Sequence, residues 1–225
     1  MSMSVVDNLL GILAPHYCTE CGAEGSVVCD WCIPDFAPPL PERCYLCKAE
    51  SKSSAVCKKC RRKSLLQHVW VRTSYEKKSK QLVHDFKFEH KLAAAITIAQ
   101  LISESLPYLP KDTIIVHIPT ATSRVRQRGY DHSEKLAKAL SNMLNLHHRT
   151  FLARTTQTRQ VGASRTDRIS QMNNAFRYVG GKNLQGQPIL LVDDITTTGA
   201  TLEAAAKCLK YAGAKRIDAV VFAQK

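Results

Sequence analysis

Residues 189–201 read ILLVDDITTTGAT, and this stretch decides the fold that we expect of the 225-residue chain. The apolar run predicts a buried strand that ends in two adjacent carboxylates, Asp193 and Asp194. A loop of hydroxyl side chains and one glycine follows, and then a helical pattern begins. Because ligands of open α/β sheets bind outside the carboxyl ends of the strands, we expect a ligand site at this strand-to-helix turn.

The loop after the carboxylates has the composition of a phosphate cradle, since backbone N–H groups, threonine hydroxyls and a helix N-terminus all favour an anion. Gly199 would let the backbone approach a phosphate closely. The predicted phosphate loop comprises Ile195, Thr196, Thr197, Thr198, Gly199, Ala200 and Thr201. It is not a Walker loop, because the chain has no G-x-x-x-x-G-K-[ST] motif.

The two carboxylates would repel a phosphate placed beside them. They make sense as acceptors of hydrogen bonds from a sugar diol at the other end of the same ligand, so Asp193 and Asp194 are the predicted catalytic residues. The alternative is an aspartate-rich helix cap after a core strand.

Apolar strands alternate with amphipathic helices over residues 65–225. We expect strands at 68–75, 113–118, 189–193 and 216–222, and helices at 78–86, 92–106, 133–144 and 201–212. We expect loops over residues 119–131 and 154–166. This alternation predicts an α/β fold, with a mainly parallel sheet covered by helices on both faces.

Eight of the nine cysteines form four C-x-x-C pairs within the first 60 residues. Each pair suits two neighbouring corners of a tetrahedral zinc site, and two pairs complete a structural Cys₄ site. The predicted ligands are Cys18, Cys21, Cys29, Cys32, Cys44, Cys47, Cys57 and Cys60. Sequential and crossed pairing of the motifs both remain open, and disulfides or free thiols are the alternative to zinc. We therefore expect a double zinc ribbon over residues 1–64 and a second domain over 65–225.

The composition, with 44% hydrophobic and 23% charged residues, is that of an ordinary globular protein. No apolar run approaches the roughly 18 residues of a membrane span. The first residues lack the basic region of a secretory signal, so we expect a cytoplasmic protein without membrane insertion.

The net charge is +13, and nearly all of it belongs to residues 65–225. Arg124, Arg126 and Arg128 follow the strand expected at 113–118. Guanidinium groups bind phosphate oxygens in a bidentate fork, so these arginines suit a pyrophosphate or a nucleic-acid backbone. The alternative is a solvated charged loop.

Residues 193–201 resemble the signature with which type I phosphoribosyltransferases bind 5-phosphoribosyl pyrophosphate (PRPP). The whole chain resembles the ComF family of competence proteins, which includes ComFC and GntX. Three segments carry this second resemblance: Pro119 to Tyr130 with Arg124, Arg128 and Gly129; Gln160 to Arg165 with Arg168, Ala175 and Phe176; and Phe86-Lys87-Phe88. The chain departs from the family where Asp131 and His132 stand in place of the usual Asn-Gln.

The resemblance implies a type I phosphoribosyltransferase-like domain behind a double zinc ribbon, with PRPP and Mg²⁺ as ligands. Asp193 and Asp194 would hold the ribose 2′- and 3′-hydroxyls, and residues 195–201 the 5′-phosphate. Lys87, Arg165 and the arginines of 124–128 would face the pyrophosphate or a DNA backbone. It also implies a role in natural transformation, in which single-stranded DNA is handled in the cytoplasm.

Three hypotheses follow for the function. The chain is an enzyme that transfers phosphoribosyl to an unidentified acceptor, a single-stranded-DNA-binding competence factor, or a zinc-ribbon adaptor for a competence helicase or another DNA-processing protein. We favour PRPP binding together with a role in DNA uptake, without a commitment to turnover.

Overall fold

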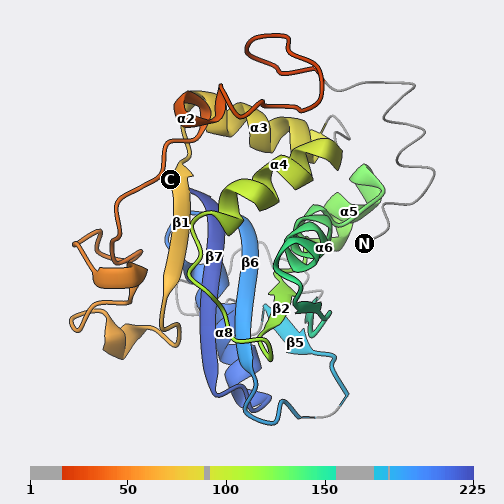
Figure 1. The fold of residues 1–225 in the computed structure, drawn as a ribbon. Coiled ribbons are helices and arrows are strands. Elements are labelled where there is room, and N and C mark those ends of the chain that lie inside the picture. The colour runs from red at the N-terminus through yellow and green to blue at the C-terminus, as the bar shows by residue number, and fades with distance from the viewer. Residues whose placement is uncertain (1–16, 89–91, 156–174, 182) are drawn as a thin grey trace, which may run out of the picture.

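The computed structural model describes residues 17–88, 92–155, 175–181 and 183–225. Its centre is a sheet of five described strands, all parallel, in the order β1-β7-β6-β2-β3 (Figure 1). The strands are β1 (Val69–Ser74), β2 (Ile114–His117), β3 (His147–His148), β6 (Pro188–Thr196) and β7 (Arg216–Gln224). β6 is the central strand, so its carboxyl end lies between the carboxyl ends of β7 and β2.

Helices cover both faces of this sheet (Figure 1). One face carries α3 (Lys77–Phe88), α4 (Leu92–Ser103) and α6 (His132–Leu144), and the other carries α8 (Ala200–Tyr211). Leu190 and Val192 of β6 belong to the first core, and Ile189 and Leu191 to the second. The apolar run of β6 is continuous because both of its faces are buried. The α/β fold with a parallel sheet is therefore confirmed.

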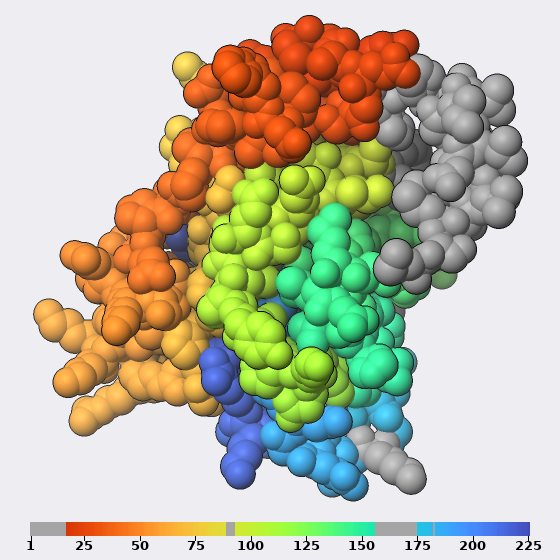
Figure 2. All heavy atoms as spheres, viewed as in Figure 1, coloured from red at the N-terminus to blue at the C-terminus, as the bar shows by residue number. Residues whose placement is uncertain are grey.

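The N-terminal cysteine-rich segments pack on opposite faces of the sheet. The first segment, which contains α2 (Ile33–Phe36), shares a core with α3 and α4 and lies at one end of this region in Figure 2 (red above yellow-green). The second contains the 3₁₀ turns η1 (Lys52–Ser54) and η2 (Arg61–Lys63) and joins the core beneath α8. Residues on both sides of position 64 thus contribute to both cores.

The expectation of a loop throughout 119–131 was wrong, because a short helix, α5 (Thr122–Arg128), forms there. Arginine and glutamine are good helix formers, and Gly129 ends the helix in the left-handed conformation with φ 78°. An antiparallel pair, β4 (Leu152–Arg154) and β5 (Phe176–Tyr178), was also not expected. The loop expected at 154–166 lies, from residue 156 onward, outside the described residues.

Within the described ranges, no helix has both the length and the apolar character needed to cross a membrane.

The packing of α6 on the sheet gives a direct stability test. Leu140 is fully buried, whereas Lys135 on the same helix is exposed. Leu140→Ala should lower the free energy of unfolding by about 3 kcal/mol, because it removes buried methyl groups and leaves a cavity. Lys135→Ala should change it by less than about 0.5 kcal/mol. Urea denaturation of the two variants beside the wild type measures both values, and equal effects would contradict the placement of α6.

Candidate functional site

The carboxyl end of β6 buries two adjacent acidic side chains. Asp193 is 9% exposed and Asp194 is 4% exposed. The backbone N–H of Asp194 donates to Oδ1 of Asp193 at 2.9 Å, which fixes the first carboxyl group against the strand. Since isolated buried carboxylates are costly, partners must compensate the charge.

Asp194 receives two such partners from the helices on one face of the sheet. Nζ of Lys87, in the last turn of α3, forms an ion pair with Oδ2 of Asp194. Nε2 of His132, the first residue of α6, lies 3.7 Å from Oδ1. Burial raises the pKa of Asp194, but His132 and Lys87 outweigh it and hold the pKa well below its usual range.

Asp193 has the opposite character. Burial and the neighbouring charge of Asp194 raise its pKa well above the usual range. The pair therefore favours a state in which Asp194 carries the negative charge and Asp193 holds a proton. Two adjacent carboxyl groups with opposite shifts are typical of functional sites.

The two residues that depart from the family pattern have definite positions. Asp131 caps α6, and its carboxylate also accepts from the backbone N–H and the hydroxyl of Thr120, at 2.9 and 2.7 Å. His132 is buried and reaches Asp194. Nη1 of Arg128 lies 3.0 Å from Nδ1 of His132. Because a guanidinium group only donates, Nδ1 accepts and the ring proton lies on Nε2, toward Asp194.

The predicted phosphate loop has the expected local geometry. Gly199 is left-handed, with φ 78°, and is the N-cap of α8. It has no side chain to cap the helix, and the hydroxyl of Thr198 accepts from the backbone N–H of Ala200 at 3.4 Å. Thr197, Thr198 and Thr201 are exposed around it. The first turn of α8 thus offers backbone N–H groups and hydroxyls on the surface, beside the buried carboxyl pair.

The predicted basic residues separate into groups. Lys87 meets Asp194, whereas Arg124 and Arg126 are exposed on α5. Arg128 is only 6% exposed, and its guanidinium carbon lies 4.6 Å from the ring centroid of Phe88. Arg165 lies outside the described residues.

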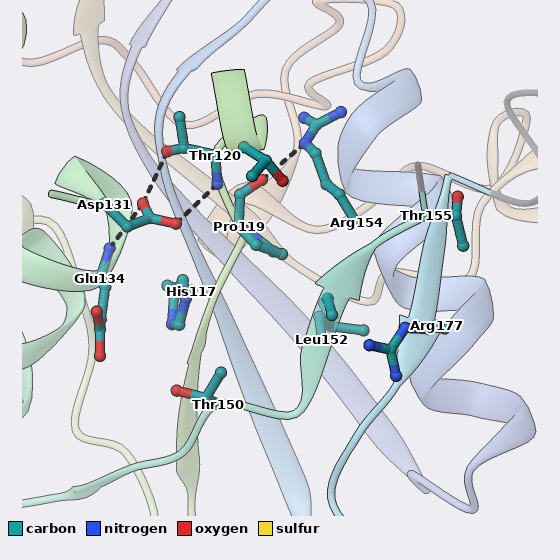
Figure 3. Close-up of a pocket in the computed structure, with 12 residues that line it drawn as sticks. His117, Pro119, Thr120, Asp131, Glu134, Thr150, Leu152, Arg154, Thr155 and Arg177 are labelled. Carbon is teal, nitrogen blue, oxygen red and sulfur yellow. Dashed lines mark hydrogen bonds between the residues drawn. The ribbon is translucent and has the colours of Figure 1, made fainter. Parts of the chain in front are cut away.

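A cavity of about 640 Å³ opens between β2, α6 and the β4–β5 pair (Figure 3). Asp131 and Thr120 line one side, and Arg154 and Arg177 the other. Arg154 donates through Nε to the carbonyl oxygen of Pro119 at 2.7 Å. Sequence reasoning did not find this cavity, because its walls come from segments that are separated along the chain.

The sulfur atoms of the eight paired cysteines form two clusters. Within each cluster the four atoms all lie within 4.8 Å of one another. The clusters are Cys18, Cys21, Cys29 and Cys32, and Cys44, Cys47, Cys57 and Cys60. The geometry thus groups the motifs sequentially rather than crossed.

The thiol chemistry of both clusters fits a bound cation. Burial opposes ionisation, but backbone N–H groups, including those of Cys21 and Cys29, lower the pKa of Cys18 to about 6. Burial and the other thiols of each cluster raise the pKa of Cys32 and of Cys60 to about 12. A divalent cation would relieve this repulsion among four sulfurs, and zinc is the usual ion for such a set.

Comparison with known proteins agrees with this architecture. The family model "Phosphoribosyl transferase domain" matches residues 95–225. Competence protein ComFC of Bacillus subtilis is 31% identical over 180 residues, which cover 76% of this chain and 72% of that protein. Competence protein F of Haemophilus influenzae is 31% identical over 61% of this chain and 64% of its own length. Competence protein ComFC of Streptococcus pneumoniae is 26% identical, over 86% of each chain.

Fold and site therefore define an α/β protein with a phosphoribosyltransferase domain and two cysteine clusters. The chain belongs to the family of competence proteins that contains ComFC and competence protein F.

Solved structures are more distant. A glutamine PRPP amidotransferase from B. subtilis matches 58% of this chain and 26% of its own, with 14% identity and a TM-score of 0.41. A purine phosphoribosyltransferase from Pyrococcus horikoshii matches 58% of this chain and 70% of its own, with 22% identity and a TM-score of 0.31. Scores this low carry no argument about ligands.

The opposite character of the two carboxyl groups predicts opposite mutational effects. Asp194→Asn leaves Lys87 and His132 without their buried partner and should lower the free energy of unfolding by about 2–4 kcal/mol. Asp193→Asn keeps an acceptor oxygen and cannot ionise. It therefore removes the cost of keeping this carboxyl group neutral on folding, and should raise that free energy by about 1 kcal/mol at pH 7.

The gain from Asp193→Asn should also depend on pH. Because the folded-state pKa of Asp193 is raised, wild-type stability falls as the pH rises from about 4 toward that pKa. The gain should therefore be smaller at pH 4 than at pH 7. Thermal and urea denaturation at both pH values test this, with the exposed Asp112→Asn as control. Equal losses in the two site variants would refute the assignment.

Proposed function

We propose that this protein binds PRPP through the carboxyl end of β6 and the N-terminus of α8, and that it acts in DNA uptake in the cytoplasm. One observation carries the proposal: a buried carboxyl pair is followed directly by exposed threonine hydroxyls and by a helix N-terminus with a glycine at its N-cap. The diol of a sugar phosphate would bind to the carboxyl pair, and its phosphate would bind to the threonine hydroxyls and the helix N-terminus.

In the proposed complex the 5′-phosphate lies on the first turn of α8, among Thr197, Thr198 and Thr201. The ribose 2′- and 3′-hydroxyls donate to Asp193 and Asp194. Lys87, already beside Asp194, supplies positive charge near the pyrophosphate. Mg²⁺ would enter with the ligand, bound mainly by pyrophosphate oxygens and water, and would neutralise part of the pyrophosphate charge.

A role beyond binding would use the same residues. Phosphoribosyl transfer loses pyrophosphate from an oxocarbenium-like ribose, so the protein's own contribution would be positioning and charge stabilisation. Lys87 would face the departing group, and the carboxyl pair would hold the ribose.

A second function, binding of single-stranded DNA, is favoured by α5. Arg124 and Arg126 are both exposed on this helix, and the chain carries a net charge of +13. Exposed arginines bind the phosphate backbone with counterion release and without sequence preference. Arg128 is excluded from this proposed surface by its burial.

An adaptor role, in contact with a competence helicase or another DNA-processing protein, is favoured by one residue of the first cysteine cluster. Trp31, between Cys29 and Cys32, is 89% exposed. Exposed tryptophans are frequent anchors of protein interfaces. In the proposed architecture both cysteine clusters hold structural zinc, which would fix the turn that presents this ring.

Calorimetric titration with PRPP and Mg²⁺ tests the first function. Wild-type protein should bind, and Asp193→Asn should weaken the affinity at least about tenfold, because one acceptor for the ribose diol becomes an amide. Asp193→Asn with Asp194→Asn should abolish measurable binding. The matched control is Asp112→Asn. Asp112 is exposed and precedes β2, so it lies near the amino ends of the parallel strands, away from the proposed site. Absence of wild-type binding at millimolar PRPP would refute the proposal.

Fluorescence anisotropy with a labelled oligothymidylate tests the second function. Arg124→Ala with Arg126→Ala should weaken binding and reduce the slope of log affinity against log salt by about 1.4, because about 0.7 is lost per phosphate contact of a single strand. Lys111→Ala with Lys135→Ala removes the same charge from other exposed positions and should change the slope far less. If both pairs of substitutions had the same effect, DNA binding would depend on the net charge of the protein and not on a surface at α5.

A further inference from the structure

A tyrosine of the second cysteine cluster packs directly behind the phosphate loop. Tyr45 follows Cys44 and is only 2% exposed. A Cβ atom built on Gly199 would lie 2.3 Å from Cε2 of the Tyr45 ring, a distance that no side chain can occupy. Gly199 is therefore needed for two reasons: its positive φ and the ring against it.

The hydroxyl of Tyr45 extends this contact to α8. It donates to Oε1 of Glu203, in the first helical turn, and the hydroxyl of Ser64 also donates to that oxygen. The backbone N–H of Leu65 donates to Oε2 of the same carboxylate at 3.0 Å. Three groups from residues 45–65 thus hold the side chain of Glu203.

The position of Glu203 matters for an anion site. A carboxylate in the first turn of a helix interacts favourably with the N-terminal dipole and would compete there with a bound phosphate. Its bonds to Tyr45, Ser64 and Leu65 commit it to the second cysteine segment instead. The exposed N-terminus of α8 stays available to a ligand.

The cysteine cluster fixes the tyrosine from the other side. Cys44 is fully buried, and its backbone N–H donates to the carbonyl oxygen of Ala49 at 2.8 Å, closing the turn that carries Tyr45. Nε2 of Gln224, at the end of β7, donates to the Tyr45 carbonyl oxygen at 3.0 Å. A metal ion on the four sulfurs would lock this turn, since it joins Cys44 and Cys47 to Cys57 and Cys60.

We propose that Tyr45 is a positioning residue for the phosphate loop, and that the metal-bound second cluster makes this loop competent to bind a sugar phosphate. The identity of the ligand in this inference rests on the proposed function. The packing of Tyr45 against the phosphate loop is independent of that function. The first cluster belongs to the core on the other face of the sheet and has no corresponding role.

Two readouts on the zinc-loaded full chain test the proposal. Hydrogen exchange of the amides of residues 197–203 measures the order of the loop without any ligand, and PRPP titration measures affinity. Tyr45→Ala should speed exchange there at least about tenfold and weaken PRPP binding at least about tenfold, while the amides of β7 keep wild-type exchange. Tyr45→Phe keeps the ring against Gly199, and both readouts should stay within about threefold of wild type.

The two clusters supply a matched pair of variants. Cys21 and Cys47 are both exposed and each is the second cysteine of its first motif. Cys47→Ser should reproduce the effects of Tyr45→Ala, whereas Cys21→Ser should stay within about threefold of wild type in both readouts. If Tyr45→Ala proves globally unfolded, with rapid exchange in β7 as well, Cys47→Ser decides the question.

Wild-type exchange at residues 197–203 in a folded Tyr45→Ala or Cys47→Ser variant would overturn the proposal. Equal effects of Cys21→Ser and Cys47→Ser would also overturn it, because the role would then not belong to the second cluster. Faster loop exchange in Tyr45→Ala, without PRPP binding by the wild type, would support the positioning role and refute the proposed function alone.

Discussion

The burial of two adjacent carboxyl groups at the end of β6 is the constraint around which the rest of the site is arranged. Neither Asp193 nor Asp194 can ionise there without a partner. Asp194 lies beside Lys87 and His132, whereas Asp193 accepts from the backbone N–H of Asp194. Lys87 comes from the end of α3 and His132 from the start of α6, so both helices must pack on the same face of the sheet to meet this charge. Burial in the same packing also disfavours the anionic form of Asp193. A buried carboxyl group with a raised pKa costs stability, and such groups are concentrated at functional sites.

The phosphate loop depends on the opposite face. Tyr45 packs against Gly199, and Tyr45 and Leu65 bind Glu203, whereas Asp194 is held from the opposite face by Lys87 of α3 and His132 of α6. The ribose and the 5′-phosphate of the proposed ligand would therefore bind to two parts of the site that are stabilised by different contacts and meet at the end of β6. The second cysteine segment supports the phosphate loop through Tyr45 and Ser64, whereas the first segment belongs to the core on the opposite face.

The sequence predicted the elements whose cause is local. The run Ile189–Val192 is apolar because both faces of β6 are covered, and the hydroxyl loop with Gly199 carries its chemistry in adjacent residues. The part that escaped prediction depends on distant contacts. Arg128 looked like a free phosphate ligand, but the capped end of α5 turns it toward His132 and Phe88. The contact of Tyr45 with Glu203 joins positions 158 residues apart, and no spacing rule could reveal it.

Comparison of ribose 5-phosphate with 2-deoxyribose 5-phosphate tests the central claim most directly, because the two ligands share the phosphate and differ by one hydroxyl. If the carboxyl pair receives the sugar diol while α8 holds the phosphate, the deoxy sugar should bind about tenfold more weakly to the wild type, and Asp193→Asn should reduce this preference. Equal affinity for the two sugar phosphates would contradict the assignment of Asp193 and Asp194 to the ribose.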